Sequence, residues 1–155
     1  ADFADMPELP VMDAALAIES FVHASSADQF FAMVSSRLCV GGRLIICDDF
    51  LAPERPPAAD FWVRRFVRGW HLNNLNTLAQ VTESAARHGL RCHSSDDLSA
   101  YTQGFHPLLL LAMRQLTRVP LPWPYWDNLA GGTALQHCLK RGWTQYHELI
   151  LEKSA

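Results

Sequence analysis

Polar side chains follow two short apolar runs near the start of the chain, at positions where they could bind a ligand. The runs span Ala14 to Ile18 and Leu44 to Cys47, and the polar residues after them are Glu19, Ser20, Asp48 and Asp49. Short, uninterrupted apolar runs are typical of buried strands in a parallel sheet. Ligands of open α/β sheets bind beyond the carboxyl ends of such strands. These side chains therefore predict a ligand site, although acids that merely sit in solvated turns would show the same pattern.

The segment between the two runs predicts the helix that would make the strands parallel. Ser25 or Ser26 is a plausible N-cap, apolar residues then recur at helical spacing, and Gly41 and Gly42 suit the end of the helix. Strand, helix and strand in this order predict a βαβ unit with a right-handed crossover.

The rest of the chain predicts mostly helices. We expect helices at Phe61–Trp70, Leu75–His88 (capped by Thr77), Tyr101–Thr117 and Tyr125–Lys140, and strands at Leu90–His93 and Trp143–Glu152.

Composition limits the possible functions. The chain has 155 residues, 19% of them charged, and a net charge of -3, so no basic surplus favours binding to nucleic acid. No run approaches the ~20 apolar residues of a membrane span. The four cysteines form no CxxC pair and the histidines are dispersed, so we expect reduced thiols, a cytoplasmic location and no metal site.

Two longer stretches resemble class I S-adenosylmethionine-dependent methyltransferases of the small-molecule branch. The stretches are "RLCVGGRLIICDD", Arg37 to Asp49, and "GGTALQHCLKRGWTQYHELILEK", Gly131 to Lys153. The resemblance implies a Rossmann-like α/β fold, with a mostly parallel sheet, a terminal antiparallel strand and a helical insertion. It also implies S-adenosyl-L-methionine as the cofactor and S-adenosyl-L-homocysteine as the product.

One feature of that family is absent. Its Gly-rich cofactor loop, of the D-x-G-x-G-x-G type, has no counterpart in this sequence. We therefore expect a partial domain, equivalent to the C-terminal half, that is inactive alone. Its parts would be a βαβ core (1–50), a helical cap with a short strand (51–130), and a terminal helix and strand (131–155).

The resemblance also implies which residues contact the cofactor and the reacting groups. Asp2 or Phe3 would contact the adenine ring, with Asp5 as a competing candidate. The stretch "IESFVH" is similar to the family's I-E-x-x-E-H motif, with Val22 in place of the second Glu. Glu19 and Ser20 would lie near the methyl donor, where the Glu19 carboxylate could stabilise positive charge. His23 could be a general base.

In the resembled family, the segment after the second strand forms part of a substrate cap. The residues that would line the pocket are Trp62, Phe66, Trp70, His71 and Asn74. An ordinary amphipathic helix that packs on the core would show the same pattern.

These inferences predict methyl transfer to an O, N or C atom of a small, rather apolar molecule. Two alternatives stay open. A nicotinamide-dependent Rossmann oxidoreductase would share the parallel strands. A non-enzymatic half-domain that acts only with a partner would account for the missing glycine loop.

Overall fold

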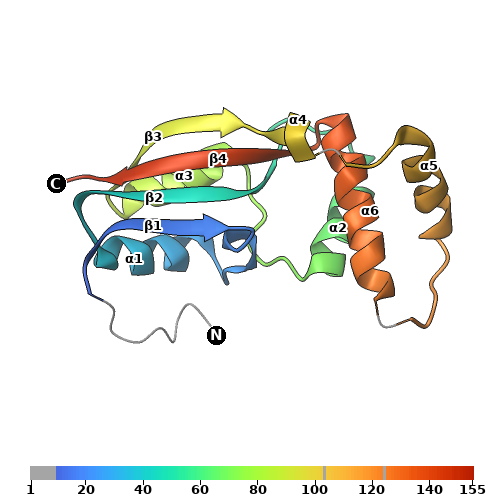
Figure 1. The fold of residues 1–155 in the computed structure, drawn as a ribbon, viewed down its shortest axis with the longest axis horizontal. Helices are drawn as coiled ribbons and strands as arrows, with labels where there is room; N and C mark the ends of the chain where they lie inside the picture. The colour runs from blue at the N-terminus through green and yellow to red at the C-terminus, as the bar shows by residue number, and fades with distance from the viewer. Residues whose placement is uncertain (1–9, 103, 124) are drawn as a thin grey trace.

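The strands form one sheet, and a group of helices lies at one end of it (Figure 1). The computed structural model describes residues 10–102, 104–123 and 125–155. The elements are β1 (Met12–Ile18), η2 (Phe21–His23), α1 (Ala27–Arg37), β2 (Leu38–Leu51), α2 (Ala59–Trp70), α3 (Leu78–Arg87), β3 (Leu90–Asp97), α4 (Ser99–Thr102), α5 (Pro107–Leu116), α6 (Trp126–Arg141) and β4 (Thr144–Lys153).

The four strands form one mixed sheet in the order β1-β2-β4-β3. β1 and β2 are parallel and are joined through α1, which confirms the predicted βαβ unit. β4 inserts between β2 and β3 and runs antiparallel to both, as predicted for the last strand. Within the described residues the sheet is therefore mixed rather than mostly parallel.

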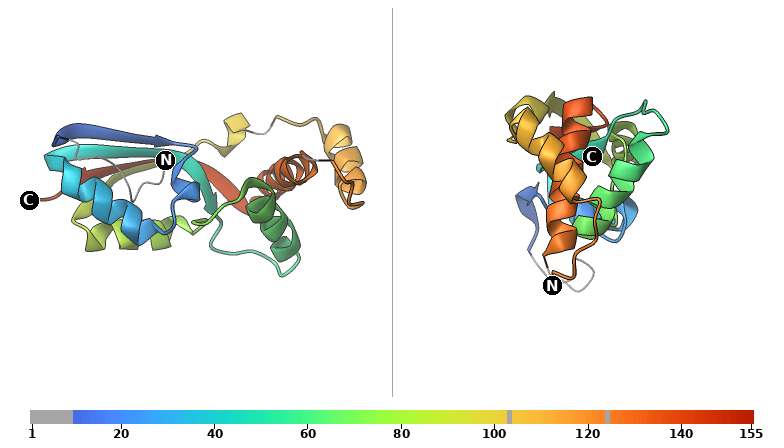
Figure 2. Two further views of the ribbon diagram at one scale, coloured as in Figure 1. Left: turned by 90° about the horizontal axis from the view of Figure 1, so that it is seen from below. Right: turned by 90° about the vertical axis from the view of Figure 1, so that its right-hand side faces the viewer.

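Helices α1 and α3 cover one face of the sheet (Figure 2, left). The core between these layers is apolar and includes Phe21, Phe31, Leu44, Ile46, Phe50, Val81 and Leu149. The opposite face is more open, because Leu16 is 68% exposed and Ile18 is 60% exposed. Apolar side chains on both faces are expected of a parallel strand that helices cover on both sides.

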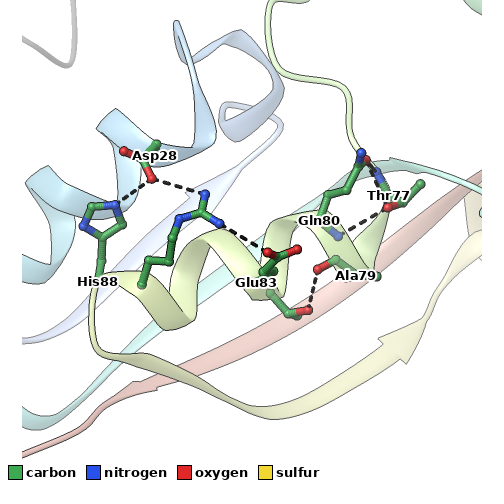
Figure 3. A network of polar contacts seen from close by, with 8 residues as sticks. Asp28, Thr77, Ala79, Gln80, Glu83 and His88 are labelled. Carbon is green, nitrogen blue, oxygen red and sulfur yellow. Dashed lines mark hydrogen bonds and ion pairs between the residues drawn. The ribbon is translucent and has the colours of Figure 1, made fainter.

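Polar contacts fix the two covering helices. Ser26 caps α1 by accepting a hydrogen bond from the Gln29 backbone N–H at 3.2 Å, and Thr77 forms a capping box with Gln80 at the start of α3. Figure 3 shows this capping box together with Asp28, which bonds the His88 ring at 2.9 Å. The contact between Asp28 and His88 links the first turn of α1 to the end of α3.

The second strand is longer than the sequence predicts. α1 ends at Arg37, and Gly41 and Gly42 lie inside β2 rather than at a helix end. Gly41 has a φ of +78°, which only glycine adopts readily, and the β1–β2 register shifts at this level. At its other end β2 continues past Asp48 and Asp49, because β4 keeps pairing with it as far as Leu51.

Helices α2, α5 and α6 lie beyond the carboxyl ends of β1 and β2 (Figure 1). α2 and α6 share a second apolar cluster that includes Val22, Trp62, Phe66, Ala134, Leu135 and Cys138. Their backbones approach closely at Gly69 and Gly131, since a Cβ on Gly131 would lie 2.9 Å from the Gly69 Cα. None of the helices in the described residues is long and apolar enough to cross a membrane.

Candidate active site

Three carboxylates converge where β1 ends beside β2. Glu19, Asp48 and Asp49 each offer one oxygen atom, and these oxygens lie within 4.8 Å of one another. Glu19 follows β1 directly, in a left-handed conformation with a φ of 50°, and its backbone N–H donates to the Cys47 carbonyl at 3.0 Å. β1 therefore stops opposite Cys47, directly before the two aspartates of β2.

Asp48 is fully buried and holds the loop that follows β1. Its Oδ2 accepts a hydrogen bond from the Val22 backbone N–H at 3.2 Å, and its Oδ1 accepts one from the Asp49 N–H at 2.9 Å. Burial raises the pKa of Asp48, and these two N–H donors oppose the rise. Asp48 therefore positions η2 relative to the sheet.

Asp49 is buried, and one of its carboxyl oxygens lacks a hydrogen bond that would offset the cost of burial. Its side chain is 3% exposed, and its Oδ1 has no hydrogen-bond partner among the described residues. Burial, and then the negative charges of Glu19 and Asp48, raise its pKa to about 8. A positive charge near Asp49 would stabilise its ionised form, so the cluster suits a cationic ligand.

Tyr146 completes this group from the neighbouring strand. It lies opposite Asp49 in the β2–β4 ladder, and its hydroxyl donates to the Cys47 carbonyl at 3.4 Å. Burial, and then a hydrogen bond to Glu19, raise the pKa of Tyr146 above its usual value, so the phenol stays protonated at neutral pH. A protonated phenol can donate a hydrogen bond to a carboxylate or to a ligand oxygen.

The other residues predicted near the methyl donor, Ser20 and His23, lie directly before η2 and at its last position. Ser20 is half-buried, and its carbonyl accepts a hydrogen bond from the His23 backbone N–H at 3.2 Å. His23 is exposed, and its carbonyl accepts a hydrogen bond from Asn73 Nδ2 at 3.2 Å.

Asn74 is 3% exposed and, like Asp48, holds η2 by hydrogen bonds to its backbone. Its Nδ2 donates to the Phe21 carbonyl at 3.3 Å, and its backbone N–H donates to the Val22 carbonyl at 3.0 Å. This side chain bonds the protein's own backbone, so its first role in the structure is to position the loop.

The other predicted pocket residues belong to α2 and its end. Trp62 and Phe66 are buried in the cluster shared with α6. Trp70 is half-buried, and its indole N–H donates to the Asn128 carbonyl at 3.2 Å. His71 is exposed and ends α2 in a left-handed conformation, with a φ of 54°. Contact of these residues with a substrate stays a prediction.

Asp2, Phe3 and Asp5, the candidates for contact with adenine, lie outside the described residues. Within the described residues, the sequence reasoning missed two features of the site. It looked for metal ligands among the histidines, whereas the convergent ligand atoms are carboxylates. It also did not place Tyr146 beside Glu19, because the pairing of β4 with β2 cannot be deduced from either strand alone.

Comparison with known proteins supports the fold. No protein-family model matches the chain. No curated protein sequence matches it either. Among solved structures, the O-methyltransferase of a trans-AT polyketide synthase multienzyme from Brevibacillus brevis, in complex with S-adenosyl-L-homocysteine, is 19% identical with a TM-score of 0.73. That match covers 99% of this chain and 48% of the solved one.

Two further structures show how varied the chemistry on this fold is. The geranyl diphosphate C-methyltransferase from Streptomyces coelicolor A3(2) is 18% identical, with a TM-score of 0.67 over 99% of this chain and 52% of that one. The [4+2]-cyclase SpnF is 19% identical, with a TM-score of 0.64 over 100% of this chain and 54% of that one.

The chain therefore has the Rossmann-like fold of S-adenosylmethionine-dependent methyltransferases, as predicted. It spans about half the length of the solved structures that it matches. At these identities the likeness establishes the fold, and the activity has to be argued from the site.

Proposed function

We propose that this chain forms one half of an S-adenosylmethionine-dependent methyltransferase that acts on O, N or C of a small, rather apolar molecule. One observation carries the proposal. On a methyltransferase fold, Glu19, Asp49 and Tyr146 gather beyond the carboxyl end of β1, where α/β folds of this kind bind their ligands. A sulfonium cation bound there would lower the pKa of Asp49 and pair with the charge that this carboxylate then carries.

The cofactor supplies an electrophilic methyl group, so the protein has little covalent chemistry to perform. Glu19 and Asp49 would attract the positive end of the cofactor, and Ser20 would contact it beside Glu19. Asp2 or Phe3 would contact its adenine ring. His23 would accept a proton from the substrate where the attacking atom carries one.

The substrate would lie between the strand ends and the helices α2 and α6. His71 and Trp70, at the end of α2, are the parts of the predicted cap that are not fully buried. Trp62 and Phe66 would shape this wall from within the α2–α6 cluster, and Asn74 would keep η2 in place. An apolar wall of this kind orders a substrate chiefly by excluding water.

The same carboxylates also fit a divalent metal ion. Asp49 Oδ1 is buried and unpaired within the described part of the chain, and oxygen ligands are those that Mg²⁺ prefers. Glu19 and Asp49 would hold such an ion, with Asp48 beside them. A bound Mg²⁺ would polarise a substrate oxygen.

A second function is favoured by one edge of the sheet. Across the described ranges no strand pairs with the outer edge of β1, and Leu16 and Ile18 are exposed. An unpaired apolar edge strand is a site for pairing with another chain segment. A non-enzymatic half-domain would use the outer edge of β1 to pair with a partner. A methyltransferase half would use the same edge to pair with the remaining strands of its domain.

Calorimetric titration of the complete fold, meaning this chain together with the half that it does not span, separates these functions. We expect saturable binding of S-adenosyl-L-homocysteine and none of NAD⁺. Saturable binding of NAD⁺ instead would favour the oxidoreductase. Assembly of a stable complex that binds neither ligand would favour the pairing module.

A further inference from the structure

A cavity lined by none of the three clustered acids lies between α2, the segment after α5 and the start of α6. Its volume is about 270 Å³. The polar residues that line it are Arg65, Arg68, Arg118, Trp126 and Asp127. None of these belongs to the strand ends or to η2, so the candidate active site leaves this cavity without a role.

The charge around the cavity is positive. Three guanidinium groups face one carboxylate, which leaves two positive charges in a chain whose net charge is -3. The Asp127 carboxylate pairs only weakly with the Arg68 guanidinium, because their contact is 3.7 Å long and both side chains are largely exposed. Arg118 donates to Gln115 at 3.0 Å, a neutral partner.

Two N–H donors at the cavity are buried and unpaired. Trp126 is 7% exposed, and neither its Nε1 nor the Nε of Arg65 has a hydrogen-bond partner within residues 10–102, 104–123 and 125–155. Burial lowers the pKa of Arg65, and the charge of Arg68 adds to this, whereas Asp127 opposes it. Buried donors without partners are rare in proteins and call for an explanation.

We propose that this cavity binds the phosphate or diphosphate group of a small molecule. Guanidinium forks match the oxygens of phosphate, and a dianion balances the two excess positive charges. The cavity also lies at the first turn of α6, whose N-terminal N–H groups favour an anion. The Trp126 and Arg65 side chains would shift slightly on binding, so that their unpaired N–H groups, which have almost no accessible surface in this structure, donate to the ligand.

Calorimetry on the 155-residue chain at low ionic strength tests the proposal, with pyrophosphate, inorganic phosphate and acetate as probes. We expect one equivalent of pyrophosphate to bind, phosphate to bind more weakly, and acetate to bind weakest because it carries a single charge. Arg65→Gln and Trp126→Phe should each weaken pyrophosphate binding by about tenfold, as expected for the loss of one charge-assisted or buried hydrogen bond.

Two variants make the comparison specific. Arg64→Gln removes the same charge from an exposed position on α2 that does not line the cavity, and should leave binding unchanged. Asp127→Asn removes the one carboxylate, and should tighten binding. Where Arg65→Gln fails to fold by circular dichroism, Arg118→Gln, exposed after α5, replaces it.

Three outcomes would overturn the proposal. The first is no saturable binding of pyrophosphate below about 10 mM, which corresponds to almost no specific affinity. The second is an equal loss in Arg64→Gln, since general attraction to a positive surface would then suffice. The third is acetate binding as tightly as pyrophosphate, because the site would then not distinguish a phosphate group.

Discussion

Asp49 and Tyr146 lie opposite each other in the β2–β4 ladder, two residues beyond the level at which β1 stops. Opposed residues of an antiparallel ladder project from the same face of the sheet. The buried carboxyl group of Asp49 and the protonated phenol of Tyr146 therefore lie on the same face of the sheet. Glu19 adds a third polar group beside them, at the end of β1.

Asp49→Asn should change the dependence of stability on pH. The usual pKa of 3.8 rises to about 8 for Asp49 in the folded chain. Below pH ~4 the carboxyl of Asp49 is protonated in both the folded and the unfolded chain. Between about pH 4 and pH 8 only the unfolded chain loses this proton, so the free energy of unfolding falls by up to about 1.4 kcal/mol per pH unit. Urea unfolding at pH 5 and pH 8 should show a smaller fall for Asp49→Asn. The exposed Asp60→Asn is the control, and an unchanged fall in Asp49→Asn would contradict the buried, unpaired carboxylate.

Glu19→Gln should lower methyl transfer without lowering stability. Glu19 is exposed, so the change opens no core cavity, and Gln keeps the side chain's size. Loss of its charge should reduce kcat/KM by about tenfold or more, since a charged hydrogen bond or ion contact in the transition state is lost. Thermal midpoint and turnover of the complete fold measure the two effects. Glu83→Gln, an exposed acid on α3, is the control. Unchanged turnover would remove Glu19 from the mechanism.

His71→Asn should separate substrate binding from folding. The residue is exposed and adopts a left-handed conformation, which Asn tolerates better than most side chains. We expect an unchanged thermal midpoint, an unchanged affinity for S-adenosyl-L-homocysteine and a KM raised by about tenfold, as expected for one lost polar contact. A fall in cofactor affinity as large as the rise in KM would show that His71 does not belong to the substrate side.

Gly131→Ala should push α2 and α6 apart. The added Cβ would lie 2.7 Å from Trp70 Cδ1 and 2.9 Å from the Gly69 Cα, and overpacking of this kind costs about 1–3 kcal/mol. Gly132→Ala is a matched control, because its Cβ would meet Trp70 at an ordinary 3.7 Å. That control should be neutral or stabilising, since Ala favours helix over Gly by about 1 kcal/mol. Equal free energies of unfolding for the two variants would contradict the close helix crossing.

The local parts of the fold could be predicted from the sequence. The caps at Ser26 and Thr77 and the parallel strands around α1 follow from short-range patterns, and all are confirmed. The length of β2 could not be predicted, because the pairing of β4 extends that strand through Asp48 and Asp49. Gly41 and Gly42 were wrongly assigned to a helix end, since glycine also suits an irregular strand position.

Part of the site could also be predicted from short-range sequence patterns. Glu19 and the two aspartates follow apolar runs, and the parallel arrangement of those runs brings them together. The contribution of Tyr146, and the use of Asp48 and Asn74 to hold η2, depend on contacts between segments far apart in the sequence. No local pattern carries that information.

The central claim is that the methyl donor lies at the ends of β1 and β2. Ultraviolet cross-linking of methyl-labelled S-adenosylmethionine to the complete fold, followed by mass mapping of peptides, tests it most directly. We predict label on the peptides that contain residues 19–23, 48–50 or 146, and competition by S-adenosyl-L-homocysteine. Label confined to other parts of the chain, or label that S-adenosyl-L-homocysteine does not displace, would contradict the claim.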